Sequence, residues 1–292
     1  MTPAPSVGLR THESDGVAAK QVNGVVVRSF GMTDPGSVRA NNEDQFLIAE
    51  LARTLWVRQT SLPQPKTHYG RNRAHLFLVA DGMGGQDFGE VASGIAVDVI
   101  PRVLQDRLAA HEHASKAVQQ AMNKAHQDIM TANVNLPDNG KQRRMGTTAV
   151  LAYQHDDQCY VAGIGDSRAY LIRDGLVEQL TIDHTVADAL VRNGTITADQ
   201  ARNSPWKNVL YRFLGCAEMT EDAEVRPFSQ QAGDRLLLAS DGLTNCISDE
   251  DLIAGAARHS NPQDWADALV QLAFDRGSRD NITCVLVFFD RE

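Results

Sequence analysis

The chain has 292 residues and a formal net charge of −9, with 28 Lys and Arg against 37 Asp and Glu. Its hydrophobic content of 42% is ample for a continuous core. It has no Lys- and Arg-rich run that would follow a phosphate backbone, and no apolar run approaching the roughly 18 residues of a membrane span. The composition therefore argues against nucleic acid as a partner and against membrane insertion.

The first 24 residues are polar and aperiodic and lack the apolar centre of a signal peptide, so residues 1–24 are expected to form a flexible N-terminal arm. The remainder contains no internal repeat and no linker rich in Pro or Gly, which favours a single domain over residues 25–292. Four cysteines lie far apart without the paired spacing of zinc or redox motifs: Cys159, Cys216, Cys246 and Cys284. A cytoplasmic protein with reduced cysteines is expected.

Segments rich in Val, Ile, Leu, Phe and Thr predict strands, and apolar residues at helical spacing predict two pairs of helices. The predicted strands are Val25 to Met32, Gln45 to Glu50, His75 to Asp81, Thr147 to Tyr153, Gln158 to Gly165, Ala169 to Arg173, Arg235 to Ser240 and Thr283 to Phe289. The predicted helices are Glu90 to Leu108, His113 to Ile129, Asp249 to Ala257 and Asn261 to Phe274, the last two with Ser248 and Asn261 as N-caps. Helix pairs between blocks of strands indicate a mainly antiparallel α+β fold.

Residues 54–73 match neither pattern. They contain Pro63, Pro65 and Gly70 and are longer than a tight turn between two strands. A surface insertion is expected there.

Acidic residues recur where apolar runs end or beside turn-forming and polar neighbours. Three predicted strands each lead directly to a carboxylate, at Asp81, Asp166 and Asp241. Other acidic residues lie in the runs Asn41-Asn42-Glu43-Asp44 and Arg279-Asp280-Asn281. Brought together without matching cations, these carboxylates would repel and raise one another's pKa, so such a cluster is tolerated mainly when hard cations lie among them. The pattern predicts a metal centre.

The segments ANNED, VADGMGG, GDSRAYL, LLASDGL and SRDNIT occur in this order over roughly residues 26–289, with MGTTAVLA from Met145 to Ala152 between them. Because these segments occur together in this order, the chain resembles the metal-dependent serine/threonine protein phosphatases of type 2C, in the compact bacterial form. The resemblance implies a four-layer α/β/β/α sandwich, in which two central sheets pack face to face, helix pairs cover the outsides and the metal centre lies at one end. It also implies hydrolysis of phosphoserine and phosphothreonine in proteins by a metal-activated water at a binuclear Mg or Mn centre.

The resemblance also implies roles for individual residues. Asp81 should bridge two metal ions, and the backbone carbonyl of Gly82 should reach one of them. Asp241 and Asp280 should complete the shell of one ion, while Glu43 and Asp44 serve the other directly or through water. Asp81, Asp44 and Arg39 are the expected catalytic residues, with the planar guanidinium of Arg39 gripping the substrate phosphate. Asn281 is expected to orient ligands rather than to bind metal.

Two positions depart from the family pattern. By analogy with bacterial members of the family, Asp166 and Asp241 are expected to hold a third, weaker ion. In this chain Asn245 stands where a further Asp is common. A third ion should therefore bind more weakly here, if it binds at all. Met83 stands where eukaryotic members often carry a His proposed as the general acid, and a methionine cannot donate a proton. The leaving group would then be protonated by metal-bound water or by another residue such as a histidine, or its protonation would contribute less to catalysis than in those members.

Residues 183–215 lie where these phosphatases place a mobile flap near the active site. Their composition alone fits an ordinary connector almost as well. Within this range His184 is expected to act as a local capping or hydrogen-bonding residue, with a catalytic role as the less favoured alternative.

Other functions remain open at this stage. The same centre could act on small phosphate esters or nucleotides, because the motifs specify the reaction more strongly than the substrate. A non-catalytic phosphate-sensing scaffold would be expected to have lost metal ligands, yet Glu43, Asp81, Asp241 and Asp280 are all present. No Cys-x5-Arg loop of a thiolate phosphatase occurs. The expected partners are phosphorylated proteins and, by analogy with bacterial relatives, an opposing serine/threonine kinase.

Overall fold

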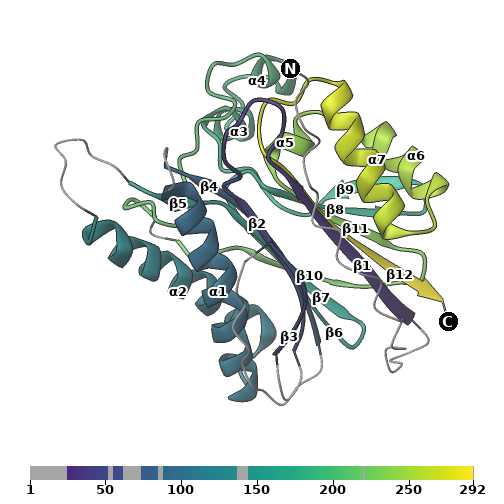
Figure 1. The fold of residues 1–292 in the computed structure, drawn as a ribbon, viewed down its shortest axis with the longest axis horizontal. Helices are drawn as coiled ribbons and strands as arrows, with labels where there is room; N and C mark the ends of the chain where they lie inside the picture. The colour runs from purple at the N-terminus through teal and green to yellow at the C-terminus, as the bar shows by residue number, and fades with distance from the viewer. Residues whose placement is uncertain are drawn as a thin grey trace, which may run out of the picture.

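Two antiparallel sheets pack face to face at the centre of the structure (Figure 1). The computed structural model describes residues 25–51, 55–61, 74–84, 88–136, 144–219 and 221–291. The five-stranded sheet has the order β1 (Val25–Asp34), β12 (Ile282–Arg291), β11 (Arg235–Ala239), β8 (Arg168–Arg173) and β9 (Leu176–Gln179). The seven-stranded sheet has the order β10 (Val225–Ser229), β7 (Gln158–Ile164), β6 (Ala149–His155), β4 (Ala74–Met83), β2 (Asp44–Leu51) and β3 (Leu55–Thr60), with β5 (Gly146–Thr147) paired to the end of β4.

The apolar pattern of the strands divides the core into layers. On β11, Leu236 and Leu238 face the other sheet, whereas Leu237 and Ala239 face the helices outside. Because successive side chains of a strand point to opposite faces, a run without polar residues is buried on both sides. The central strands are therefore rigid supports for the residues at their ends.

Helices cover both outer faces. Helices α1 (Phe88–Ala109) and α2 (Ala114–Val134) pack on the seven-stranded sheet, and α6 (Asp249–Arg258) and α7 (Pro262–Asp275) pack on the five-stranded sheet (Figure 1). Three short helices, α3 (Val186–Arg192), α4 (Ala198–Arg202) and α5 (Asp241–Thr244), lie at one end of the sandwich. The N-cap predictions are confirmed, because Ser248 accepts the Asp251 N–H and Asn261 accepts the Gln263 N–H.

The predicted α+β sandwich and its main elements are confirmed, but sequence patterns missed several short or edge strands. Strand β9 has only four residues, and β10 contains Pro227, which is tolerated on an edge strand but weakens a sequence-based strand prediction. Strand β3 forms the other edge of its sheet and lies within residues 54–73, the expected surface insertion. The rest of that range except residue 61, and the predicted N-terminal arm over residues 1–24, fall outside the described residues. Among the described helices, none is both long and apolar enough to cross a membrane.

Candidate metal centre

Acidic residues meet where strands of both sheets begin or end. Asp44 opens β2 and lies directly opposite Asp81 of β4 in the antiparallel ladder, so both side chains emerge on the same face as close neighbours. Asp166 follows β7, Asp241 begins α5 just after β11, and Asp280 lies just before β12. Neighbouring antiparallel strands run in opposite directions, so the end of one and the start of the next share one edge. Five segments distant in sequence thereby bring carboxylates together.

These carboxylates are close enough to perturb one another. Burial, followed by the charges of Asp241 and Asp280, raises the pKa of Asp44 to about 7, against hydrogen bonds that lower it. Burial, followed by the charge of Asp44, raises the pKa of Asp81 well above its ordinary value. Burial and the charge of Asp280 raise the pKa of Asp241 to about 6, and burial and the charge of Asp241 raise that of Asp166 to about 7. A bound cation would relieve this repulsion.

Asp44 offers the sharpest test of whether the residues fit a metal. Its side chain is 1% exposed, and its Oδ2 accepts a hydrogen bond of 2.7 Å from Ser240 Oγ. Its Oδ1 is buried and no group meets hydrogen-bond geometry with it, although the nearby Thr283 hydroxyl, like that of Ser240, lowers the pKa of Asp44. A buried carboxylate oxygen without a partner is costly unless something positive meets it, and hard divalent cations prefer such oxygens. The donor set therefore fits Mg or Mn.

Ligand geometry alone would not have identified this centre. In the part of the chain that the structure describes, no group of three His, Cys, Asp or Glu side chains has the geometry of a metal-binding site. Several acidic oxygens have protein partners instead. Arg39 Nη2 lies 2.7 Å from Asp280 Oδ2, and Asn245 Nδ2 donates to Asp241 Oδ2 over 3.2 Å. The centre is recognised by its excess of buried negative charge.

Asn281 joins the loop before β2 to the start of β12. Its Oδ1 accepts the backbone N–H of Glu43 at 2.9 Å, and its Nδ2 donates to the carbonyl oxygens of Pro35 and Asn41 at 2.9 and 3.0 Å. The structure thus places Asn281 where it orients the segment that carries Arg39 and Glu43.

Glu43 and Gly82 occupy a tight space at the start of α1. The N–H of Gly82 donates to the carbonyl of Glu43, which also accepts a hydrogen bond of 2.6 Å from Ser93 Oγ. A Cβ added to Gly89 would lie 2.6 Å from the Glu43 carboxyl carbon. A larger residue at position 89 would therefore displace this carboxylate from its place near the positive end of α1, which favours it.

Hydroxyl groups support the acidic residues, and sequence reasoning had not singled them out. Besides Ser240 on Asp44, Thr148 Oγ1 accepts the backbone N–H of Asp81 at 3.0 Å and lies 2.7 Å from Ser167 Oγ. Ser240, Thr148 and Ser167 lie in the segments LLASDGL, MGTTAVLA and GDSRAYL, and their position in these motifs is the sequence signal that could have identified them. Met83 lies at the end of β4, paired with Gly146.

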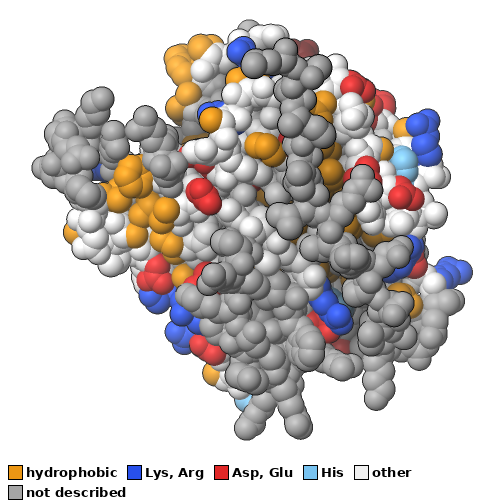
Figure 2. Space-filling view, in the orientation of Figure 1, with side chains coloured by type: hydrophobic (Ala, Val, Ile, Leu, Met, Phe, Trp, Pro, Cys, Tyr) orange, Lys and Arg blue, Asp and Glu red, His pale blue; other side chains and the backbone are white. Residues whose placement is uncertain are grey.

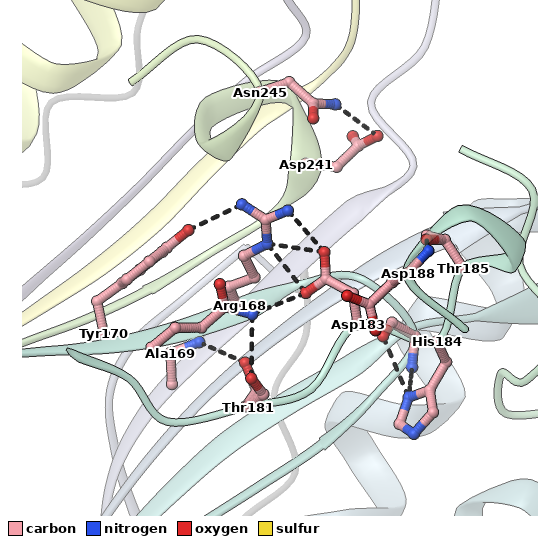
Figure 3. Close-up of polar contacts among 12 residues, drawn as sticks. Arg168, Ala169, Tyr170, Thr181, Asp183, His184, Thr185, Asp188, Asp241 and Asn245 are labelled. Atoms are coloured by element: carbon pink, nitrogen blue, oxygen red, sulfur yellow. Dashed lines mark hydrogen bonds and ion pairs between the residues drawn. The ribbon is translucent and has the colours of Figure 1, made fainter. Parts of the chain in front are cut away.

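The flap region packs beside Asp166. Arg168 forms a two-pronged ion pair with Asp183, at 2.9 Å from Nε and 2.6 Å from Nη2, and donates from Nη1 to Tyr170 Oη (Figure 3). Trp206, Val209 and Tyr211 are exposed, and Figure 2 shows hydrophobic side chains gathered on the lobe that carries α3 and α4.

His184 attaches the flap region to the strand end that carries Asp166. Its Nδ1 lies 3.2 Å from the Gly165 carbonyl oxygen and its Nε2 lies 3.1 Å from Arg212 Nη1. Because an arginine only donates, Nε2 accepts from Arg212 and a neutral ring carries its proton on Nδ1, where the Gly165 carbonyl accepts it. The Gly165 N–H, 3.1 Å from the same Nδ1, then has no acceptor in this ring. Burial, followed by the charge of Arg212, lowers the pKa of His184 to about 4. The hydrogen-bonding role expected from the sequence accounts for this histidine.

Comparisons with known proteins agree with this geometry. Residues 60–283 match the family model described as Protein phosphatase 2C. The chain is 33% identical over 259 residues to the serine/threonine phosphatase stp of Listeria innocua, covering 87% of this chain and 93% of the relative. It is 32% identical over 263 residues to the serine/threonine protein phosphatase PstP of Mycobacterium tuberculosis, covering 90% of this chain and 45% of that relative.

Solved structures show the same likeness. The crystal structure of the M. tuberculosis phosphatase PstP superposes with a TM-score of 0.73 at 30% identity, covering 91% of this chain and all of that one. A crystal structure of the PstP catalytic domain in complex with two manganese ions superposes with a TM-score of 0.70 at 29% identity, covering 91% of this chain and 99% of that one.

Proposed function

This chain belongs to the protein phosphatase 2C family of metal-dependent protein serine/threonine phosphatases, and from that premise we propose that it hydrolyses phosphoserine and phosphothreonine at a centre for two Mg or Mn ions formed by its cluster of buried carboxylates. The observation that carries this proposal is the Asp44–Asp81 pair. Two acidic side chains lie opposite each other across β2 and β4, burial raises the pKa of both, and Asp44 Oδ1 has no protein partner. The manganese ions in the PstP catalytic domain support the same conclusion.

We take the ligand roles from the family resemblance, and the meeting of these residues at one end of the sandwich supports them. Asp81 and the Gly82 carbonyl would hold the two ions, with Asp241 and Asp280 as further ligands of one ion and Glu43 and Asp44 serving the other directly or through water. When bound, the ions supply an activated water as nucleophile and neutralise the phosphate oxygens. Ser240 fixes the orientation of the Asp44 carboxylate through its hydrogen bond.

Arg39 binds the substrate phosphate from the edge of the centre. Its guanidinium is about half exposed and is held by Asp280 at 2.7 Å, so it has donors left for an incoming phosphate. Holding the guanidinium in advance reduces the conformational entropy lost when the phosphate binds.

A third ion near Asp166 binds weakly. Asn245 contributes no charge, and its amide N–H occupies Asp241 Oδ2. His184 does not replace the general acid missing at Met83, because both of its ring nitrogens are engaged and its pKa is lowered to about 4. The opposing partner is a serine/threonine kinase that phosphorylates the same substrates.

Manganese titration tests the centre directly. Isothermal titration calorimetry of the chelator-treated protein should show two strong sites, and Asp44→Asn should weaken one of them by about tenfold or more. Asp264→Asn, an exposed position on α7, is the matched control and should bind like the wild type. Hydrolysis of a phosphothreonine peptide should require Mn or Mg and stop with EDTA. Full turnover with chelator, or no manganese uptake, would contradict the proposal.

A further inference from the structure

A cavity of about 860 Å³ separates the flap region from α5 and α6. Its wall includes the Arg168–Asp183 pair on one side and Thr244 and Asn245 on the other. Asn245 donates to Asp241, so the cavity begins directly beside the acidic centre (Figure 3). Its volume lies within the range of ligand sites. Any chain whose phosphorylated side chain reached Asp241 would have this cavity beside it.

Thr244 brings an unused hydrogen-bonding group to this wall. The residue is 5% exposed, and its Oγ1 is buried without a hydrogen-bond partner. A buried hydroxyl without a partner costs free energy, which a ligand that bonds to it recovers. Thr244 is thus suited to bind the amide or carbonyl of a polypeptide main chain.

The charges that line the cavity are unevenly matched. Asp183 pairs with Arg168, Asp188 with Arg192 at 3.1 Å, and Arg202 with Asp199 at 3.0 Å. The remaining charged lining residues, Lys207 on the flap side and Asp249 and Glu250 on α6, make no ion pair among the described residues. Asp249 and Glu250 are adjacent and exposed in the first turn of α6. Asp249 and Glu250, which we call the α6 rim, would therefore attract a positively charged group of a ligand.

We propose that this cavity receives the polypeptide segment that flanks the phosphorylated residue, and that its α6 rim selects a basic side chain in that segment. Thr244 Oγ1 hydrogen-bonds to the main chain of the segment, and the carboxylates of Asp249 and Glu250 attract a Lys or Arg side chain. This inference rests on the proposed function, since it names the class of phosphoprotein that the same centre accepts. Small phosphate esters lack both a main chain and a basic side chain, so neither Thr244 nor the rim contributes to their binding.

Phosphothreonine peptides with a single Arg or Glu at successive positions around the phosphothreonine test the rim. The wild type should prefer Arg at one or two positions, and Asp249→Asn with Glu250→Gln should lower kcat/KM for those peptides by about fivefold, mainly through KM. Asp264→Asn with Asp267→Asn removes two carboxylates from α7, outside the cavity, and should keep the preference. No preference in the wild type, or an equal loss in the α7 control, would overturn the inference.

Thr244 provides a second, independent test. Thr244→Val should raise KM for every peptide by about fivefold, the size of one hydrogen bond, and should raise Tm because a buried hydroxyl without a partner is removed. Thr244→Ser should restore the wild-type KM. An unchanged KM in Thr244→Val would overturn the role of the hydroxyl.

Hydrolysis of para-nitrophenyl phosphate with Mn separates these outcomes from failure of the metal centre. All the cavity variants should hydrolyse it like the wild type, because it has no flanking segment. If the wild type itself does not hydrolyse it, the metal-centre proposal fails. If the wild type hydrolyses it but shows no Arg preference, only the cavity inference fails.

Discussion

The two ends of the β-sandwich differ in how their acidic residues are paired: arginines neutralise them at one end and are too few at the other. Strand β11 has Asp234 just before it and Asp241 just after it, and β12 begins next to Asp280 and contains Asp290 near its end. Asp234 is 1% exposed and accepts hydrogen bonds from Arg173 at 2.7 and 2.6 Å and from the Gln231 N–H at 2.7 Å. Asp290 pairs with Arg28 at 2.6 Å and with Arg235 at 2.9 Å.

At the opposite end, positive side chains are too few for the carboxylates. Among the described residues, Asp280 pairs with Arg39, whereas the side-chain partners of Asp44 and Asp241 are a neutral hydroxyl and a neutral amide. Burying an acidic side chain without a matching cation is unfavourable, and this chain does it several times at one end only. Carboxylates paired with arginines stabilise the fold, whereas buried carboxylates without a cationic partner indicate where a cation from solution binds.

The largest effect should come from Asp81→Asn. Removing the carboxylate proposed to hold both ions should lower kcat by about a thousandfold or more, measured on a phosphothreonine peptide with saturating Mn. In the presence of EDTA the same variant should be more stable than the wild type, because mutual repulsion among the carboxylates falls. A variant that kept its activity, or that lost stability with EDTA, would remove the distinction between the two ends.

Asp234→Asn should produce the opposite phenotype. It leaves Arg173 without its partner at the charge-matched end and should lower the free energy of unfolding by about 3 kcal/mol, measured by urea denaturation. Its kcat and its manganese affinity should remain those of the wild type, because the acidic centre is at the other end of β11. A loss of manganese binding in this variant would show that the two ends are not independent.

The metal-free protein should become more stable as the pH falls from 8 to about 6.5. The folded-state pKa values of Asp44 and Asp166, both about 7, lie above their ordinary values, so the folded state binds protons more tightly than the unfolded state in this window. His184, with its pKa lowered to about 4, opposes this trend increasingly as the pH falls through about 6.5, where the unfolded chain gains a proton. Urea midpoints in EDTA at these two pH values measure the trend, and saturating Mn should flatten it.

The smallest effect should come from Asn245→Asp, which adds one more unmatched carboxylate beside Asp241. A third manganese site should tighten by about tenfold, detected by calorimetry, because the added ligand is charged. The metal-free protein should lose a little stability for the same reason. Asn245→Ala is the matched control and should leave the third site weak.

The sequence was sufficient for elements with a strong local signal. Runs such as those of β4, β7 and β11 predict buried strands, and the acidic residue after each run marks the candidate site. The edge strands β9 and β10 were missed, because β9 is short and β10 contains Pro227, whereas the edge strand β1 has a long apolar pattern and was predicted. The matching of charges could not be predicted either. Arg39 and Asp280 are 241 residues apart, and only the folded arrangement shows which carboxylates find an arginine.

The Asn281 side chain has a consequence for biosynthesis. It holds the backbone of Glu43, 238 positions earlier in the chain, and that of Pro35, 246 positions earlier. A ribosome must therefore synthesise the chain as far as Asn281 before the early segment acquires its anchor. Nascent or prematurely terminated products that lack Asn281 and β12 should be inert toward phosphoproteins, so that activity begins only when β12 has been translated.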